Sequence, residues 1–200
     1  MSSSTATEQP SPKASGSRKP LIIGAFIALG VLLIGVASLL INHSATASNP
    51  LISSTAQVGK PVPSFSLPNL MGPGTVGVPE NGGRKGKAAV LVFFASWCGP
   101  CQQEMPGLAK AVRDGEAGKA AVIGVDGSDQ RSAAVAFVNK TGITFPVGAD
   151  DVYAVTSGKF GFSGLPETVF VNDQGIVTEI HFGATTPALL RQGVRNMGAA

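Results

Sequence analysis

The sequence predicts an α/β domain with a mixed central sheet and helices on both faces, preceded by one N-terminal transmembrane helix. Three observations support this fold class. Continuous apolar runs at residues 88–95 and 120–125 enclose a helix-compatible segment, which is typical of two buried parallel strands joined by a helix. Alternating apolar runs near the C-terminus indicate an antiparallel hairpin. A long uncharged run at residues 21–41 indicates the transmembrane helix.

The run from Leu21 to Ile41 contains no charged residue. At about 1.5 Å per helical residue, it is long enough to span a hydrocarbon layer of roughly 30 Å. Arg18 and Lys19 precede it, whereas the next charged residue after it is Lys60. This asymmetry predicts a single-pass signal-anchor in the cytoplasmic membrane, with the N-terminus inside and the C-terminal domain extracytoplasmic.

A cleavable signal peptide is the alternative, because residues 45–47 (Ala-Thr-Ala) fit the small-residue pattern of a cleavage site. The apolar run is longer than the ~7 to 15 residues usual for such a peptide, which favours the anchor. Residues 1–20 are rich in Ser and Pro and predict a disordered cytoplasmic tail. Residues 42–57 read as a polar linker to a single domain at 58–200.

The distribution of charge argues against nucleic-acid binding. The formal net charge is +3, and residues 1–20 hold three basic residues and one acid, which leaves +1 for the rest. The remaining Lys and Arg residues are scattered among acids instead of forming a basic patch. Nucleic acid is therefore not an expected partner.

Gly, Pro and polar residues divide the domain into short elements. The predicted order is strand 88–95, helix 99–114, strand 120–125, helix 132–140, strand 144–148, helix 151–157, strands 167–171 and 176–182, and helix 187–197. Gly175 supplies the turn of the hairpin, and Thr186 is a plausible cap for the last helix, with Pro187 at its first position. The sheet is thus predicted to be parallel at its start and antiparallel at its end.

The chain has two cysteines, Cys98 and Cys101, in a C-x-x-C spacing. A structural disulfide at this spacing closes a very small loop and restrains the unfolded chain little. A structural zinc site needs typically four ligands, but His43 lies in the linker and His181 stands alone on a late strand. Redox chemistry is therefore the favoured interpretation.

The predicted elements give each thiol a mechanism. If the helix begins near Gly99, Cys98 lies at its N-terminus, where free N–H groups and the helix dipole stabilise a thiolate. Cys98 is then the nucleophile. Pro100 fits the first helical turn, and Cys101 lies one turn further, where it can attack a mixed disulfide on Cys98 and release the product.

Two motifs carry a family resemblance. They are Trp97-Cys98-Gly99-Pro100-Cys101, followed by Pro106, and Gly164-Leu165-Pro166-Glu167-Thr168 before the penultimate strand. Together they resemble the thioredoxin superfamily, which implies a thioredoxin-like fold. Residues 59–67 and the extra helix and strand at 131–148 narrow the resemblance to membrane-anchored TlpA, ResA and DsbE-like thiol-disulfide oxidoreductases with a redoxin or AhpC/TSA-like domain. The resemblance covers residues 58–198.

The resemblance implies a role for each matched position. Cys98 attacks the substrate disulfide, and Cys101 resolves the mixed disulfide. Pro166 is a cis-proline that faces the thiols, and the backbone of Leu165 pairs with substrate peptide. The other substrate-binding residues lie beside the thiols and are Trp97, Gly99 and Pro100.

Glu104 lies three residues after Cys101, on the same helix face. The sequence alone allows either an acid that complements the helix dipole or a functional residue. The resemblance implies that Glu104 lies near the thiols and tunes their proton affinity. A carboxylate there raises the pKa of a neighbouring thiol, which favours a mild reductant over a strong oxidant.

The expected function is reduction of disulfides in secreted or membrane-attached proteins such as apocytochrome c, as in cytochrome c biogenesis. A transmembrane electron-donor protein is the implied partner, and no cofactor is expected beyond the dithiol. Disulfide formation by the same residues is the alternative. A copper-binding assembly factor would need His181, and a peroxiredoxin-type peroxidase would need Thr where Ala95 stands. The Gly-rich segment 71–87 departs from the family pattern, so the early hairpin is expected to be altered.

Overall fold

The computed structural model describes residues 56–79, 87–162 and 164–198. The predicted tail, the anchor and nearly all of the linker lie outside these ranges. Within them, no helix combines the length and the apolar character needed to cross a membrane.

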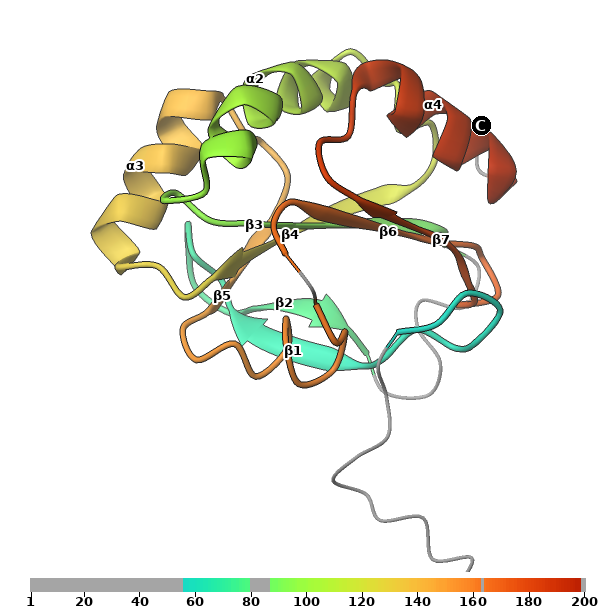
Figure 1. The fold of residues 1–200 in the computed structure, drawn as a ribbon, viewed down its shortest axis with the longest axis horizontal. Helices are drawn as coiled ribbons and strands as arrows, with labels where there is room; N and C mark the ends of the chain where they lie inside the picture. The colour runs from blue at the N-terminus through green and yellow to red at the C-terminus, as the bar shows by residue number, and fades with distance from the viewer. Residues whose placement is uncertain (1–55, 80–86, 163, 199–200) are drawn as a thin grey trace, which may run out of the picture. The chain divides into compact units, whose positions relative to one another are not determined.

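The domain is built on a five-stranded mixed sheet in the order β5-β4-β3-β6-β7 (Figure 1). The strands are β3 (Ala89–Phe94), β4 (Ala121–Gly127), β5 (Val147–Asp150), β6 (Glu167–Val171) and β7 (Val177–Phe182). β4 is parallel to both β3 and β5, whereas β6 is antiparallel to both β3 and β7. The predicted mixed sheet is confirmed. β5 begins later than expected, because Pro146 precedes it and a proline has no N–H for the ladder.

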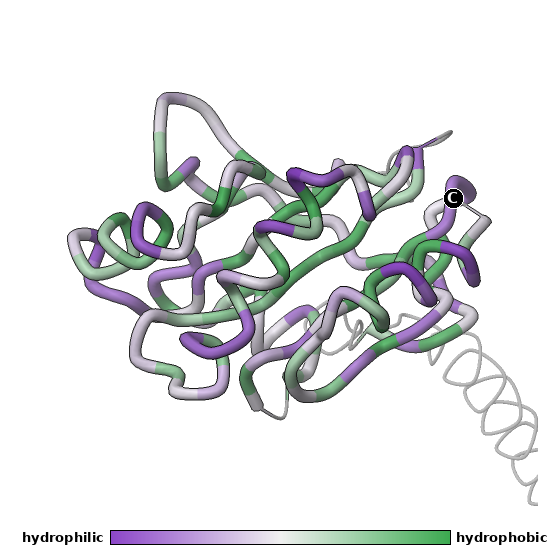
Figure 2. The backbone as a smooth tube through the Cα atoms, turned by 90° about the horizontal axis from the view of Figure 1, so that it is seen from above, coloured by the Kyte–Doolittle hydropathy of each residue, from purple (hydrophilic) through white to green (hydrophobic). Residues whose placement is uncertain are grey.

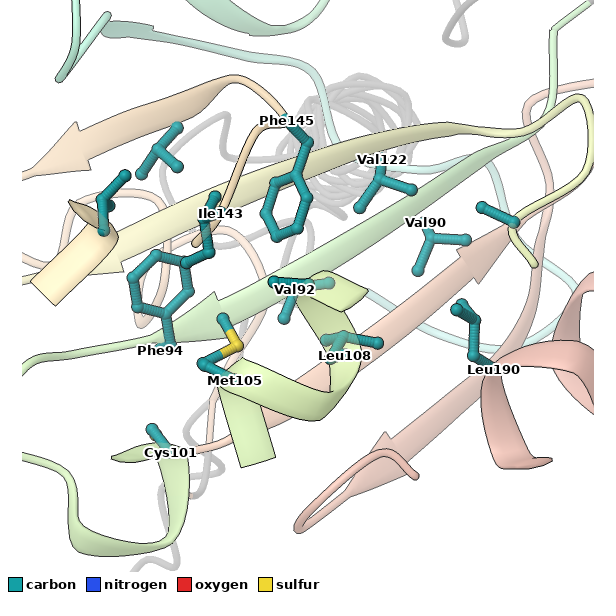
Figure 3. Close-up of a cluster of buried hydrophobic side chains, with 14 of the residues drawn as sticks. Val90, Val92, Phe94, Cys101, Met105, Leu108, Val122, Ile143, Phe145 and Leu190 are labelled. Atoms are coloured by element: carbon teal, nitrogen blue, oxygen red, sulfur yellow. The ribbon is translucent and has the colours of Figure 1, made fainter. Parts of the chain in front are cut away.

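The helices pack on one face of the sheet, although helices on both faces were expected. They are α2 (Gly99–Arg113), α3 (Arg131–Thr141) and α4 (Pro187–Asn196). Buried residues of all three belong to one hydrophobic cluster with Val90, Val92 and Phe94 of β3. Figure 3 shows these three side chains opposite Met105 and Leu108 of α2.

The other face is covered by a hairpin of β1 (Phe65–Pro68) and β2 (Thr75–Val78) together with the loop 151–162. The Gly-rich segment therefore includes a strand, β2. Gly77 is required there, because a side-chain carbon at this position would come within 2.0 Å of the Phe65 carbonyl oxygen. Figure 2 shows that hydrophobic stretches run through the middle of the domain.

The predicted helix 151–157 is wrong, and the segment forms a series of turns. Asp150 ends β5, and its carboxylate accepts hydrogen bonds from the amides of Val155 and Thr156. Tyr153 has a positive φ of 56°, which a regular helix does not allow. A side chain that binds the amides of the following turn competes with helical hydrogen bonding, and this explains the difference.

The C-terminal elements follow the prediction closely. Asn172 accepts hydrogen bonds from the amides of Gln174 and Ile176, and Gly175 has a φ of 79° in the turn between β6 and β7. The Thr186 hydroxyl accepts a hydrogen bond from the Leu189 amide and caps α4.

Candidate active site

The two cysteines lie where β3 passes into α2, and they form a disulfide. Cys98 is the N-cap residue of α2, as the sequence predicts, and its Sγ accepts a hydrogen bond from the Cys101 amide at 3.2 Å. No acidic residue occupies the first turn of α2. The helix terminus therefore favours negative charge on the Cys98 sulfur once the disulfide is reduced.

The two cysteines differ in accessibility. Cys98 retains 5% exposure, whereas Cys101 has none. Gly99 and Pro100, which separate them, are exposed. Cys98 is therefore the more accessible of the two cysteines, and Cys101 lies buried in the first turn of α2.

Pro166 lies at the same end of the sheet as the disulfide, where β3 ends and β6 begins. The Leu165–Pro166 peptide bond is cis, as the resemblance implied. Glu167 directly follows it and pairs with both Phe93 of β3 and Phe182 of β7. Because β3 leads within a few residues to Cys98, the sheet brings the two predicted motifs together at one of its ends.

Two exposed aromatic side chains lie at this end of the sheet. Trp97 is 55% exposed and Phe182 is 60% exposed. The indole Nε1 of Trp97 donates a hydrogen bond to the Ser128 carbonyl oxygen at 3.3 Å, which fixes the ring in an exposed position. In the part of the chain that the structure describes, the Leu165 backbone makes no hydrogen bond, so its polar groups are free to pair with an extended peptide.

Glu104 is buried in α2, and neither of its carboxylate oxygens has a hydrogen-bond partner of good geometry. Burial raises the pKa of Glu104 to about 7, and the nearby backbone amide of Thr185 only partly opposes this shift. Glu104 lines a pocket together with Thr185 and with Pro187 at the start of α4. It can therefore take up or release a proton near neutral pH.

Two further buried carboxyl groups were missed by the sequence interpretation. Burial raises the pKa of Glu167 to about 7, and its Oε2 has no hydrogen-bond partner. The pKa of Asp126, near the end of β4, is raised to about 8, chiefly by burial and then by the neighbouring Asp129 and Asp151. An acid that ends or begins an apolar strand was the available signal at both positions.

Within the described ranges, no group of three or more His, Cys, Asp or Glu residues could hold a metal ion. His181 lies on β7, and its Nε2 is 3.3 Å from the carbonyl oxygen of Ala184.

The site combines a helix-capping cysteine, a second cysteine one turn deeper and a cis-proline at the same end of the sheet. These features define a thiol-disulfide oxidoreductase of thioredoxin-like fold. The sequence matches the AhpC/TSA family over residues 58–180. The chain therefore belongs to the AhpC/TSA family.

Named relatives agree with this class. The thiol:disulfide interchange protein DsbE of Yersinia pestis is 30% identical over 84% of this chain and 88% of its own length. The thiol-disulfide oxidoreductase ResA of Halalkalibacterium halodurans is 27% identical over 70% of this chain and 76% of its own length. The structure of MTB dsbF, solved in mixed oxidized and reduced forms, is 31% identical with a TM-score of 0.57, and covers 68% of this chain and 98% of that one.

Proposed function

We propose that the protein reduces disulfides in secreted or membrane-attached client proteins, such as apocytochrome c. One observation carries this direction: the buried, unpartnered Glu104 lies one helical turn beyond Cys101. A carboxyl group there opposes formation of a thiolate, and an unstabilised thiolate makes a dithiol more reducing. The catalytic set is Cys98, Cys101, Glu104 and Pro166.

Client binding is proposed at the end of the sheet where Pro166 lies. The free backbone of Leu165 supports addition of an extended peptide strand, and exposed Trp97 supports contact with its side chains. Gly99 and Pro100 leave the approach to Cys98 open. The other proposed partner is a membrane protein that passes electrons to the Cys98–Cys101 disulfide, because an extracytoplasmic reductase needs a donor across the membrane.

The proposed location is the outer side of the cytoplasmic membrane, with residues 21–41 as the anchor. Support comes from the uncharged run, from the positive charges that precede it and from the interchange activity named for the relatives. No cofactor beyond the dithiol is proposed.

The reduction potential of the full chain in detergent tests the direction. A value near that of thioredoxin, about −270 mV, is expected for a reductase. A value near that of DsbA, about −120 mV, would reverse the assignment in favour of disulfide formation. This second candidate has its own support, because the Cys101 amide and the start of α2 stabilise a Cys98 thiolate.

Glu104→Gln is expected to lower the pKa of the Cys98 thiol, because it removes a carboxyl group that becomes charged near neutral pH. The measurement is the pH dependence of thiolate absorbance in the reduced chain. Glu116→Gln is the matched control, since Glu116 lies beyond the end of α2 and pairs with Arg191. An unchanged thiol pKa in Glu104→Gln would remove this residue from the site.

A further inference from the structure

The turn that precedes Cys98 is held by a carboxylate from another element. Asp129, in the loop between β4 and α3, accepts two hydrogen bonds from Ser96. The Ser96 amide donates to Oδ2 at 2.5 Å, and the Ser96 hydroxyl donates to Oδ1 at 2.6 Å. Hydrogen bonds to an ionised acceptor are about twice as strong as neutral ones. Asp129 therefore fixes both the backbone and the side chain of the residue two positions before the nucleophile.

Two more contacts hold the same turn. Gln102, in the first turns of α2, donates from its Nε2 to the Ser96 carbonyl oxygen at 2.7 Å. Trp97 donates to the Ser128 carbonyl oxygen, as described above. Ser96 and Trp97 are thus tied to the loop after β4 and to α2, and their position sets where α2 begins and where the Cys98 sulfur points.

Asp126 lies three residues before Asp129 and interacts with it electrostatically. Asp126 is 2% exposed, and Asp129 is close enough to contribute to the raised pKa of its carboxyl group. Burial chiefly, and then the neighbouring Asp129 and Asp151, raise the pKa of Asp126 to about 8, so Asp126 is largely protonated at neutral pH.

Within residues 56–79, 87–162 and 164–198, Asp126 forms no ion pair with a cation. Its strand partners are Phe94 on β3 and Ala149 on β5, both apolar. Asp150, the next residue on β5, directs its carboxylate to the amides and hydroxyl of its own turn. The charged groups that act on Asp126 are Asp129 and Asp151, both negative. Loss of the Asp126 proton therefore places two repelling charges beneath the turn.

We propose that Asp129 is a positioning residue for the dithiol chemistry, with the buried carboxyl group of Asp126 beside it. Asp129 touches neither sulfur. It acts through Ser96 by holding the turn that aims Cys98 at the incoming disulfide. A misplacement of about 1 Å at a reacting atom can lower a rate by about 100-fold, so loss of this hold is expected to slow exchange without removing it.

Asp129→Asn tests whether the hydrogen bonds from Ser96 to Asp129 position Cys98. It keeps the size of the side chain, but its amide nitrogen cannot accept the second hydrogen bond from Ser96. The rate constant for reduction of a disulfide-bonded peptide by the reduced full chain is expected to fall about 10-fold or more. Ser96→Ala removes only the hydroxyl contact and should cause a smaller decrease. Asp114→Asn, a conversion on the exposed end of α2, is the control and should leave the rate unchanged.

Asp126→Asn distinguishes positioning from simple loss of stability. The asparagine side chain is uncharged at every pH, so the variant should match the wild-type rate at pH 6. Between pH 7 and 9 the ratio of the variant rate to the wild-type rate should rise several-fold, because only the wild type loses its proton near pH 8. The ratio cancels the ionisation of Cys98 common to both proteins. A flat ratio, or wild-type rates in both Asp129→Asn and Ser96→Ala, would overturn the proposal. If Asp129→Asn fails to fold, Ser96→Ala and Asp126→Asn still decide.

Discussion

Cys98→Ser is expected to abolish reduction of a disulfide-bonded peptide, lowering the rate by more than about 10³-fold. Cys98 is the more exposed of the two cysteines in the chain, and it lies at the N-terminus of α2. A serine hydroxyl does not ionise near neutral pH and does not exchange with disulfides. The measurement is the steady-state reduction of the peptide with a chemical dithiol as electron donor.

Cys101→Ser is the informative partner of that variant. It retains the attacking sulfur but lacks the group that resolves the mixed disulfide, so it should form one covalent adduct and then stop. Asp114→Asn, at the exposed end of α2, serves as a control that leaves both sulfurs and the proposed substrate-binding residues in place. Turnover by Cys98→Ser above the level of the chemical donor alone would exclude Cys98 as the nucleophile.

The oxidised protein is expected to lose stability as the pH rises from about 5 to 8. Glu104 and Glu167 have pKa values of about 7, and Asp126 has a pKa of about 8, all raised chiefly by burial from ordinary values of 4.5, 4.5 and 3.8. Between its ordinary pKa and its raised pKa, each group binds a proton in the folded state but not in the unfolded state. The free energy of unfolding therefore decreases with pH, by at most about 1.4 kcal/mol per pH unit for each group.

Urea unfolding of the oxidised protein at several pH values measures this effect, and the disulfide removes thiol ionisation from the comparison. Glu104→Gln, Glu167→Gln and Asp126→Asn should each flatten the dependence, since each removes one titrating group. Asp173→Asn is a control on the exposed hairpin turn. A stability that is constant or rises between pH 5 and 8 would show that these carboxyl groups are ionised in the folded protein.

The central β-α-β unit could be predicted because its signals are local. Residues 89–94 are all buried, so the strand reads as one continuous apolar run, and the cysteines and Pro100 mark the helix start. The hairpin of β1 and β2 was not predicted as strands, because each has only four residues and Gly77 weakens the pattern. The loop after Asp150 was misread because its structure depends on one side chain that replaces helical hydrogen bonds.

The candidate site divides in the same way. Cys98, Cys101 and Pro166 belong to short motifs and could be found from the sequence. Asp129 could not, because its contact with Ser96 joins residues 33 positions apart. Buried carboxyl groups such as Glu167 depend likewise on packing from several elements, and their titration follows from burial that no local pattern reveals.

Alkylation of the freshly reduced protein with iodoacetamide tests the central claim most directly. The claim is that Cys98 is an ionisable, reachable thiol at the start of α2 and that Cys101 is shielded behind it. Peptide mapping by mass spectrometry at neutral pH should find the label on Cys98, with Cys101 unmodified until much later. Equal labelling of the two cysteines, or faster labelling of Cys101, would contradict the assignment.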